Sequence, residues 1–298
     1  MRNRPNIAAS VLARLKNLAK EHSLVYNDIL QRYAVERILK RLERSPFASK
    51  CILKGGSLFI IWSDGFAYRP TMDIDLEFRG QGSVENLLQV FRDLATIPGE
   101  EEDGLRIDAE SLACVPIRED DSYGGIRVTM KAYIGSVRLP IQFDIGIGDA
   151  VTPMPRKALF PVLLGGEPPR VKIYPKETVV SEKLETIVRR GFANSRMKDY
   201  YDLFVLSLEG DLDSTILRRA IERTFERRRT PIPMVVPDGL LDSFATDSLK
   251  QAQWRAFLRK NHLNLREKTF LAVVRELRSF FSEILGGWRM KRNGEIEE

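Results

Sequence analysis

The sequence predicts an α+β protein, with strands in its first half and helices in its second. Apolar residues recur at helical spacing over residues 8–42, which predicts two helices at the start of the fold. Later runs at residues 73–78, 126–130 and 137–145 alternate between apolar and polar residues, as strands with one packed face do. Beyond residue 175 the pattern is again mainly helical.

The chain length favours two compact units. Its 298 residues exceed a typical single domain. The segment 153–169 is rich in Pro and Gly and interrupts the strand pattern, so we place the boundary there. We expect one unit over residues 1–165 and a mainly helical unit over residues 166–298. With 43% hydrophobic and 30% charged residues, the composition is that of a folded globular protein.

The composition also bears on location and partners. No stretch approaches the roughly 18 apolar residues of a membrane-spanning helix, so we expect a cytoplasmic protein without a membrane partner. The formal net charge of +6 favours a polyanionic partner but does not demand one. Basic residues cluster in two places, which a solvated helix face would explain equally well. They are Arg218, Arg219, Arg223, Arg227, Arg228 and Arg229, and then Arg289, Lys291 and Arg292.

A strand, a tight turn and a helix are predicted over residues 51–62. Two apolar runs flank the sequence Lys54-Gly55-Gly56-Ser57, and Ser57 is placed to cap the following helix. The backbone N–H groups of such a turn, together with a hydroxyl, can hold phosphate oxygens. The same turn is also common as a simple connection.

The acidic residues of two alternating runs predict a metal site. Asp73 and Asp75 point to the same side of one strand, roughly 6–7 Å apart. Asp144 lies on the polar face of a later strand. If the two strands are neighbours, the three carboxylates form an oxygen cage suited to Mg²⁺ or Mn²⁺. An Asp-x-Asp pair on a strand is, however, often only solvated.

The helical half contains three charged residues in apolar surroundings. Lys183 falls within an apolar arc of its helix, where its amine either extends to solvent or meets an anion. Asp199 and Asp202 lie in a largely apolar and aromatic helix, and buried carboxylates are costly unless they are paired. A structural salt bridge to Lys183, Arg189 or Arg196 is one interpretation of these acids. A role in a binding site is the other.

Four sequence blocks, spread over residues 50–208, together resemble a known family. They are Leu53-Lys54-Gly55-Gly56-Ser57, Arg69-Pro70-Thr71-Met72-Asp73-Ile74-Asp75-Leu76, Ser181-Glu182-Lys183-Leu184-Glu185 and Arg196-Met197-Lys198-Asp199-Tyr200-Tyr201-Asp202-Leu203. They are similar to the AbiEii/AbiGii toxin family, the nucleotidyltransferase half of AbiE-type toxin–antitoxin and abortive-infection systems. The resemblance implies a DNA polymerase β-like nucleotidyltransferase domain with a mixed, largely antiparallel sheet, followed by a C-terminal helical domain.

The resemblance also implies roles for individual residues. Asp73, Asp75 and Asp144 would bind Mg²⁺ (or Mn²⁺) and act in catalysis. Phosphates would lie on the turn formed by Lys54, Gly55, Gly56 and Ser57. Lys183 would hold the triphosphate tail, and Asp199, favoured slightly over Asp202, would position the nucleotide or the acceptor. Arg69 would either contact phosphate or neutralise the acids.

The implied reaction is the transfer of a nucleoside monophosphate from a nucleoside triphosphate to RNA. The favoured acceptor is the 3′ end of tRNA, where added nucleotides would block translation and growth. A cognate antitoxin is a further implied partner. Two alternatives stay open: a nucleotidyltransferase that modifies a protein or a small molecule, and a non-catalytic protein that binds nucleotides or RNA through an inherited fold.

Overall fold

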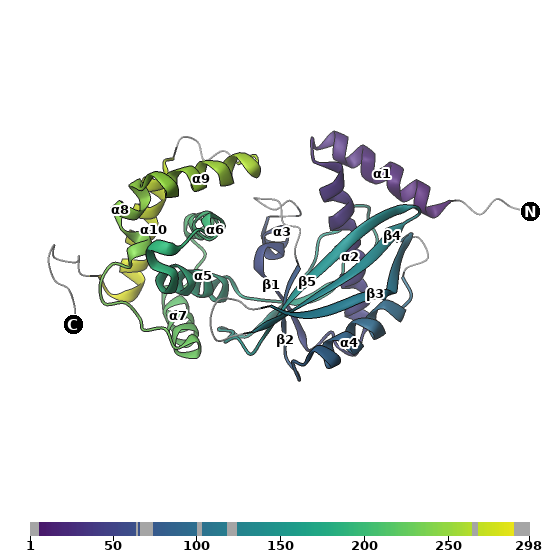
Figure 1. Ribbon diagram of the computed structural model, residues 1–298, viewed down its shortest axis with the longest axis horizontal. Coiled ribbons are helices and arrows are strands. Elements are labelled where there is room, and N and C mark those ends of the chain that lie inside the picture. The colour runs from purple at the N-terminus through teal and green to yellow at the C-terminus, as the bar shows by residue number, and fades with distance from the viewer. Residues whose placement is uncertain are drawn as a thin grey trace, which may run out of the picture. The chain divides into compact units, whose positions relative to one another are not determined.

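The computed structural model describes residues 6–63, 65, 74–99, 103–117, 124–263 and 268–288 (Figure 1). The chain divides into two compact units. The first contains Met1–Asp149 and Pro155–Tyr174, and the second contains Ala150–Met154 and Pro175–Glu298. The residues after position 165, up to Tyr174, therefore lie in the first unit.

The first unit is built on a mixed sheet. In the described residues seven strands lie in the order β3-β4-β5-β2-β1-β7-β6. They are β1 (Cys51–Lys54), β2 (Ile74–Phe78), β3 (Leu105–Ile117), β4 (Gly125–Ile134), β5 (Val137–Ile147), β6 (Arg156–Leu159) and β7 (Arg170–Ile173). The pairs β1–β7 and β2–β5 are parallel, and the other neighbours are antiparallel. The mixed, largely antiparallel sheet expected from the sequence is confirmed.

Helices bury the apolar side of this sheet. Helices α1 (Ile7–Glu21), α2 (Tyr26–Arg44) and α4 (Val84–Thr96) contact the strands, and the short α3 (Leu58–Trp62) follows β1 and a turn. Figure 1 shows α2 and α4 beside the strands, and α2 contacts β5 and β7. The rings of Phe91 on α4 and Phe143 on β5 lie 5.0 Å apart, and both side chains are buried. Because successive side chains of a strand alternate between faces, Asp144 points to the side opposite Phe143.

Three strands were not predicted from the sequence. In β3 the pairing with β4 shifts register between Asp108 and Ala113, and this bulge breaks the alternation of apolar residues. Strands β6 and β7 have four residues each, too few to establish a period, and β6 lies inside the Pro- and Gly-rich segment. Strand β7 is nevertheless held by its parallel pairing with β1.

The second unit is helical, as the sequence predicts. Its helices are α5 (Lys176–Arg190), α6 (Met197–Leu208), α7 (Ser214–Arg228), α8 (Asp242–Thr246), α9 (Ser248–Lys260) and α10 (Phe270–Leu285), with 3₁₀ turns η2 (Gly191–Ala193) and η3 (Asp238–Leu240). Buried aromatic rings from α6, α8, α9 and α10 form its core; Tyr200 stacks on Phe244 at 5.6 Å and Trp254 on Phe270 at 4.9 Å. Among the described helices, none combines the length and apolar character that a membrane crossing requires.

A fully buried carboxylate on α2 makes the stability of the first unit depend on pH. Glu36 accepts hydrogen bonds from Arg32 Nε at 3.2 Å and from the Leu163 amide at 3.0 Å. Burial outweighs the neighbouring Arg32 and Arg37 and raises the pKa of Glu36 to about 7. A raised carboxyl pKa contributes stability at low pH, and this contribution is lost as the pH rises from about 4.5 to about 7.

We therefore expect the free energy of unfolding to fall between pH 5 and pH 7.5, by as much as about 3 kcal/mol. Urea unfolding of wild type and of Glu36→Gln at both pH values measures this difference. The substituted amide cannot ionise, so the variant should lose much less stability over the same interval. An equal loss in both proteins would assign the pH dependence to another group.

Candidate active site

The turn after β1 brings backbone close to the acidic strand β2. It forms the 3₁₀ turn η1 (Gly55–Ser57), in which Gly55 has a φ of +69°. A Cβ atom at Gly55 would lie 2.6 Å from Cγ and 2.8 Å from Cβ of Asp75, closer than non-bonded carbon atoms approach. The Asp75 side chain therefore fills the space that a side chain at position 55 would need.

Ser57 does not have the capping role predicted from the sequence. Its backbone is helical, with φ −64° and ψ −19°, and its side chain makes no capping hydrogen bond to α3. The reason is that the 3₁₀ turn already continues into α3, so Ser57 lies inside the helical segment instead of before it. Gly56 and Ser57 are both buried in this turn.

The strand pairing places four charged residues in one row across the polar face of the sheet. Lys54 is the partner of Asp75 in the antiparallel β1–β2 pair. Asp75 is the partner of Asp144 in the parallel β2–β5 pair. In the antiparallel β4–β5 pair, Asp144 is the partner of Arg127. Paired residues present their side chains on the same face, and adjacent strands are about 4.8 Å apart. Asp75 and Asp144, 69 positions apart in the chain, are thus neighbours.

Arg127 holds both carboxylate oxygens of Asp144. Its Nε atom lies 2.8 Å from Oδ1 and its Nη2 atom 2.9 Å from Oδ2. The Arg127 side chain is 39% exposed and that of Asp144 23% exposed, so solvent reaches the pair. Arg127 was not among the residues predicted from the sequence. Its place in the alternating run 126–130 was visible there, but its partner depends on the register of β4 with β5.

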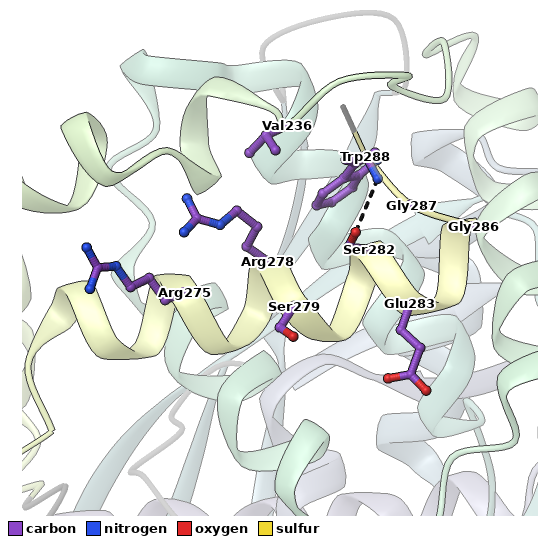
Figure 2. Close-up of a pocket in the computed structure, with 9 residues that line it drawn as sticks. All are labelled: Val236, Arg275, Arg278, Ser279, Ser282, Glu283, Gly286, Gly287 and Trp288. Atoms are coloured by element: carbon purple, nitrogen blue, oxygen red, sulfur yellow. Dashed lines mark hydrogen bonds between the residues drawn. The ribbon is translucent and has the colours of Figure 1, made fainter. Parts of the chain in front are cut away.

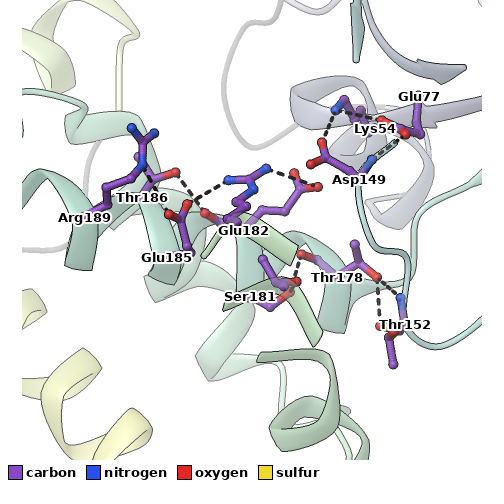
Figure 3. A network of polar contacts seen from close by, with 12 residues as sticks. Lys54, Glu77, Asp149, Thr152, Thr178, Ser181, Glu182, Glu185, Thr186 and Arg189 are labelled. Carbon is purple, nitrogen blue, oxygen red and sulfur yellow. Dashed lines mark hydrogen bonds and ion pairs between the residues drawn. The ribbon is translucent and has the colours of Figure 1, made fainter. Parts of the chain in front are cut away.

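Lys54 is held by two further carboxylates (Figure 3). Its Nζ atom lies 3.3 Å from Oε2 of Glu77 and 3.0 Å from Oδ2 of Asp149. Glu77 is fully buried, and its Oε1 accepts a hydrogen bond of 2.8 Å from the Asp149 amide. Gly146 lies opposite Glu77 on β5, and a Cβ there would lie 2.9 Å from Glu77 Oε2. The absence of a side chain at position 146 leaves room for this network.

Removal of the Lys54 amine is expected to destabilise the first unit, because it leaves the buried Glu77 charge uncompensated. Lys54→Met should cost about 3 kcal/mol or more in free energy of unfolding. Adding Glu77→Gln to Lys54→Met should recover part of this loss, because the amide carries no charge. Urea unfolding of the single and double variants forms the test. A double variant less stable than Lys54→Met would contradict this account.

A second charged cluster lies within the helical unit. Lys183 on α5 binds Oδ1 of Asp199 at 2.7 Å and Oδ2 of Asp202 at 2.8 Å. Arg196 Nε lies 2.7 Å from the other oxygen of Asp199. Both aspartates on α6 are buried, with 1% of each residue exposed. Lys183 thus meets anions, and the salt bridges that the sequence left open are formed by Lys183 and Arg196.

This cluster perturbs the ionisation of Asp199. Burial alone would raise its pKa, but Lys183 and Arg196 outweigh burial and hold the pKa well below the usual range. Arg189, the third cation considered from the sequence, instead lies 3.2 Å from the buried Glu185.

The arginine cluster of the sequence divides into paired and exposed residues. Arg228 binds Glu185 at 2.9 Å, and Thr230 donates to the same carboxylate at 2.7 Å; the surrounding network is drawn in Figure 3. Arg218 pairs with Glu222 at 3.2 Å on the surface of α7. Arg219 and Arg223, one helical turn apart, are exposed on the same helix. Arg228 is therefore bound within the protein, whereas Arg219 and Arg223 face solvent.

A hollow of about 620 Å³ also lies in the helical unit, along α10 (Figure 2). Trp288 is fixed beside it by hydrogen bonds to Ser282 Oγ at 3.1 Å and Pro233 O at 3.0 Å. The guanidinium groups of Arg275 and Arg278, which also line it, both bind Asp242. Of the predicted active-site residues that the structure describes, none lines this hollow.

The predicted site residues are thus found in two groups. The described part of the first unit brings together Lys54, Gly55, Gly56, Ser57, Asp75 and Asp144, and the second unit brings together Lys183, Asp199 and Asp202. Asp73 and Arg69 lie outside the described residues. Among the residues that are described, no group of three metal-ligating side chains occurs. Asp75 and Asp144 nevertheless supply adjacent carboxylates, the ligand type that Mg²⁺ prefers.

The comparison with one solved structure supports the fold, and a second solved structure was also found. The crystal structure of JHP933 from Helicobacter pylori has 16% sequence identity and a TM-score of 0.50, covering 88% of this chain and 93% of that chain. A crystal structure described as a candidate nucleotidyltransferase from H. pylori has 16% identity and a TM-score of 0.48, covering 88% and 96%. No curated protein sequence gives a significant match.

The sequence itself identifies the family. The profile described as "Nucleotidyl transferase AbiEii toxin, Type IV TA system" matches residues 37–276, which is most of the chain. The match includes both the Gly55 turn with its acidic strands and the Lys183 cluster. The chain therefore belongs to the AbiEii family of nucleotidyltransferase toxins of type IV toxin–antitoxin systems.

Proposed function

We propose that this nucleotidyltransferase uses Mg²⁺ (or Mn²⁺) to transfer a nucleoside monophosphate from a nucleoside triphosphate to RNA, with the 3′ end of tRNA as the favoured acceptor. The observation that carries the proposal is the parallel pairing of β2 with β5. It makes Asp75 and Asp144 neighbours, beside a glycine turn against which the Asp75 side chain packs.

In the proposed reaction, residues of the first unit would bind the cation, bind the phosphates and accept the proton. Asp75 and Asp144, together with Asp73, would hold the cation, and the backbone N–H groups of Gly56 and Ser57 would donate to phosphate oxygens. A bound divalent cation would stabilise negative charge on the triphosphate and on the leaving pyrophosphate. The acceptor hydroxyl oxygen would bond to the α-phosphorus as the bond to pyrophosphate breaks. Asp144 would accept the hydroxyl proton.

The helical unit would contribute to substrate binding. Lys183 would provide positive charge for the triphosphate tail, and Asp199, or else Asp202, would position the nucleotide or the acceptor. The salt bridges to Asp199 and Asp202 hold the Lys183 amine in one place. The exposed Arg219 and Arg223 on α7 would contact RNA phosphates, which makes RNA binding weaker as the salt concentration rises.

A labelling experiment tests the proposal. Purified protein with Mg²⁺ is incubated with each of the four α-³²P-labelled triphosphates and with tRNA. We expect wild type to label tRNA and Asp144→Asn to lose at least about 100-fold in rate, since the removed charge serves both metal and proton. Asp93→Asn, which removes an exposed acid from α4 of the same unit, is the matched control and should label normally.

The same assay distinguishes the other acceptors. In a whole-cell lysate, label that is removed by ribonuclease supports RNA, whereas label removed by protease identifies a protein acceptor. Metal-dependent binding of a triphosphate without any transfer would identify a non-catalytic nucleotide-binding protein. Unlabelled tRNA, or normal labelling by Asp144→Asn, would refute the proposed function.

A further inference from the structure

The Arg127–Asp144 ion pair has a consequence for metal binding, because it occupies the carboxylate proposed as a metal ligand. The guanidinium donates one hydrogen bond to each oxygen of the carboxylate, at 2.8 Å and 2.9 Å. Gln142 Nε2 lies 3.4 Å from Oδ1 of the same residue. Both oxygens of Asp144 therefore already face a cation of the protein itself.

We infer that Arg127 is the built-in counter-ion of Asp144, which competes with the divalent cation for this carboxylate and thereby weakens metal binding. This inference rests on the proposed function, in which Asp144 is a metal ligand. It concerns Arg127, a positioning residue that acts through Asp144.

The charges on the sheet explain why such a counter-ion is needed. Asp75 and Asp144 lie on neighbouring strands, about 4.8 Å apart in the backbone, and like charges at this distance repel. Arg127 neutralises one of the two, whereas Lys54, at the other end of the row, is held by Glu77 and Asp149. A divalent cation bound at the carboxylates would perform the same neutralisation, and it would repel the guanidinium. The two cations therefore oppose each other at Asp144.

The exposure of the pair allows this exchange. Arg127 is 39% exposed, so its guanidinium is able to leave Asp144 for solvent without being buried unpaired. The ion pair at Glu77 differs, because Glu77 is fully buried and its lysine is only 14% exposed. A divalent cation can therefore replace Arg127 at Asp144. The same replacement is not expected for Lys54, whose ion pair with Glu77 is buried.

Direct binding of Mn²⁺ to the full chain, measured by electron paramagnetic resonance without nucleotide, tests the inference. Arg127→Gln should bind Mn²⁺ more tightly than wild type, by on the order of tenfold, because a charge-assisted bidentate pair no longer competes. Arg138→Gln is the matched control. It removes the same charge from the same face of β5, about 20 Å along the strand from Asp144, and should bind as wild type does.

Thermal unfolding with and without Mn²⁺ provides a second measurement. Without metal, Arg127→Gln should melt below wild type, because Asp144 has lost its counter-ion. Saturating Mn²⁺ should raise its melting temperature by more than it raises that of wild type. If Arg127 only stabilised the fold, Arg127→Gln would lower the melting temperature by the same amount with and without Mn²⁺.

Asp144→Asn separates a failure of this inference from a failure of the proposed function. If Asp144→Asn weakens Mn²⁺ binding but Arg127→Gln leaves it unchanged or weaker, Asp144 is a ligand and only the competition is refuted. If Asp144→Asn binds Mn²⁺ as wild type does, Asp144 is not a ligand and both proposals fall. Tighter binding by Arg127→Gln, with weaker binding by Asp144→Asn, supports both.

Discussion

Gly55→Ala is expected to abolish nucleotidyl transfer, with a loss of at least about 1,000-fold in rate, because the substitution displaces a carboxylate that we propose binds the metal. A methyl group at position 55 would overlap the Asp75 side chain, whose Cγ would lie 2.6 Å away. Asp75 would have to turn away from Asp144, its partner on β5. Labelling of RNA by the variant, under the conditions used for wild type, measures the effect.

The control must separate this overlap from the general strain of a left-handed backbone. Gly55 has a φ of +69°, where alanine costs about 1–2 kcal/mol. Gly165, in the same unit, has a φ of +83°, and a Cβ added there would meet no atom within 4 Å, so Gly165→Ala has the strain without the overlap. Gly165→Ala should lose stability and keep its transfer rate. Equal losses of activity in both variants would show that backbone strain, not Asp75, is responsible.

Lys183→Met is expected to have the largest effect on stability, about 3–5 kcal/mol in free energy of unfolding, because it leaves two buried carboxylates without their shared partner. Asp199 and Asp202 are each 1% exposed. Arg196 still compensates Asp199 in the variant, so the loss of the lysine is felt most at Asp202. Urea unfolding of the full chain, followed by circular dichroism of the helices, measures the change.

Lys176→Met is the matched control on the same helix. Lys176 also binds two carboxylates, Glu209 and Asp211, but the Asp211 side chain is 55% exposed and solvent replaces the lost contact. Its removal should cost about 1 kcal/mol or less. A similar cost for both lysines would show that burial of the aspartates does not set the energy of the Lys183 cluster.

The charge of Asp199 makes the stability of the cluster formed by Lys183, Asp199 and Asp202 depend on pH. The pKa of Asp199 lies below its usual range in the folded protein, so its contribution to stability is present above about pH 4 and is lost as the pH falls below that value. In Lys183→Met, Asp199 keeps Arg196 but loses Lys183, so its pKa is lowered less than in wild type. The difference in stability between wild type and this variant should therefore shrink as the pH is lowered below about 4.

The sequence predicted the candidate site residues whose placement follows from local pattern. Strand parity alone placed Asp75 and Asp144 on polar faces, and the apolar arc around Lys183 predicted that its amine either extends to solvent or meets an anion. The family resemblance then grouped these residues into one reaction. Both kinds of inference use short segments, in which neighbouring positions determine which way a side chain points.

The partners of these residues could not be predicted, because they depend on long-range register. Arg127 meets Asp144 only because β4 pairs with β5 in one alignment, and a shift by one residue would turn Arg127 to the other face. Asp149 reaches Lys54 from 95 positions away in the chain. Glu77 had a local signal, as the third acid of the alternating run 73–78, but nothing nearby indicated its lysine partner.

The parallel pairing of β2 with β5 also determines when, during synthesis, the proposed site can form. A parallel pair needs a long connection. Asp144, the partner of Asp75, is synthesised 69 residues later in the chain. Strand β1 likewise gains its outer neighbour only when β7 has been made. A nascent or truncated chain that ends before β5 holds the glycine turn and the first acids but lacks the carboxylate beside them. The proposed transfer therefore requires a chain that has been synthesised at least through β5.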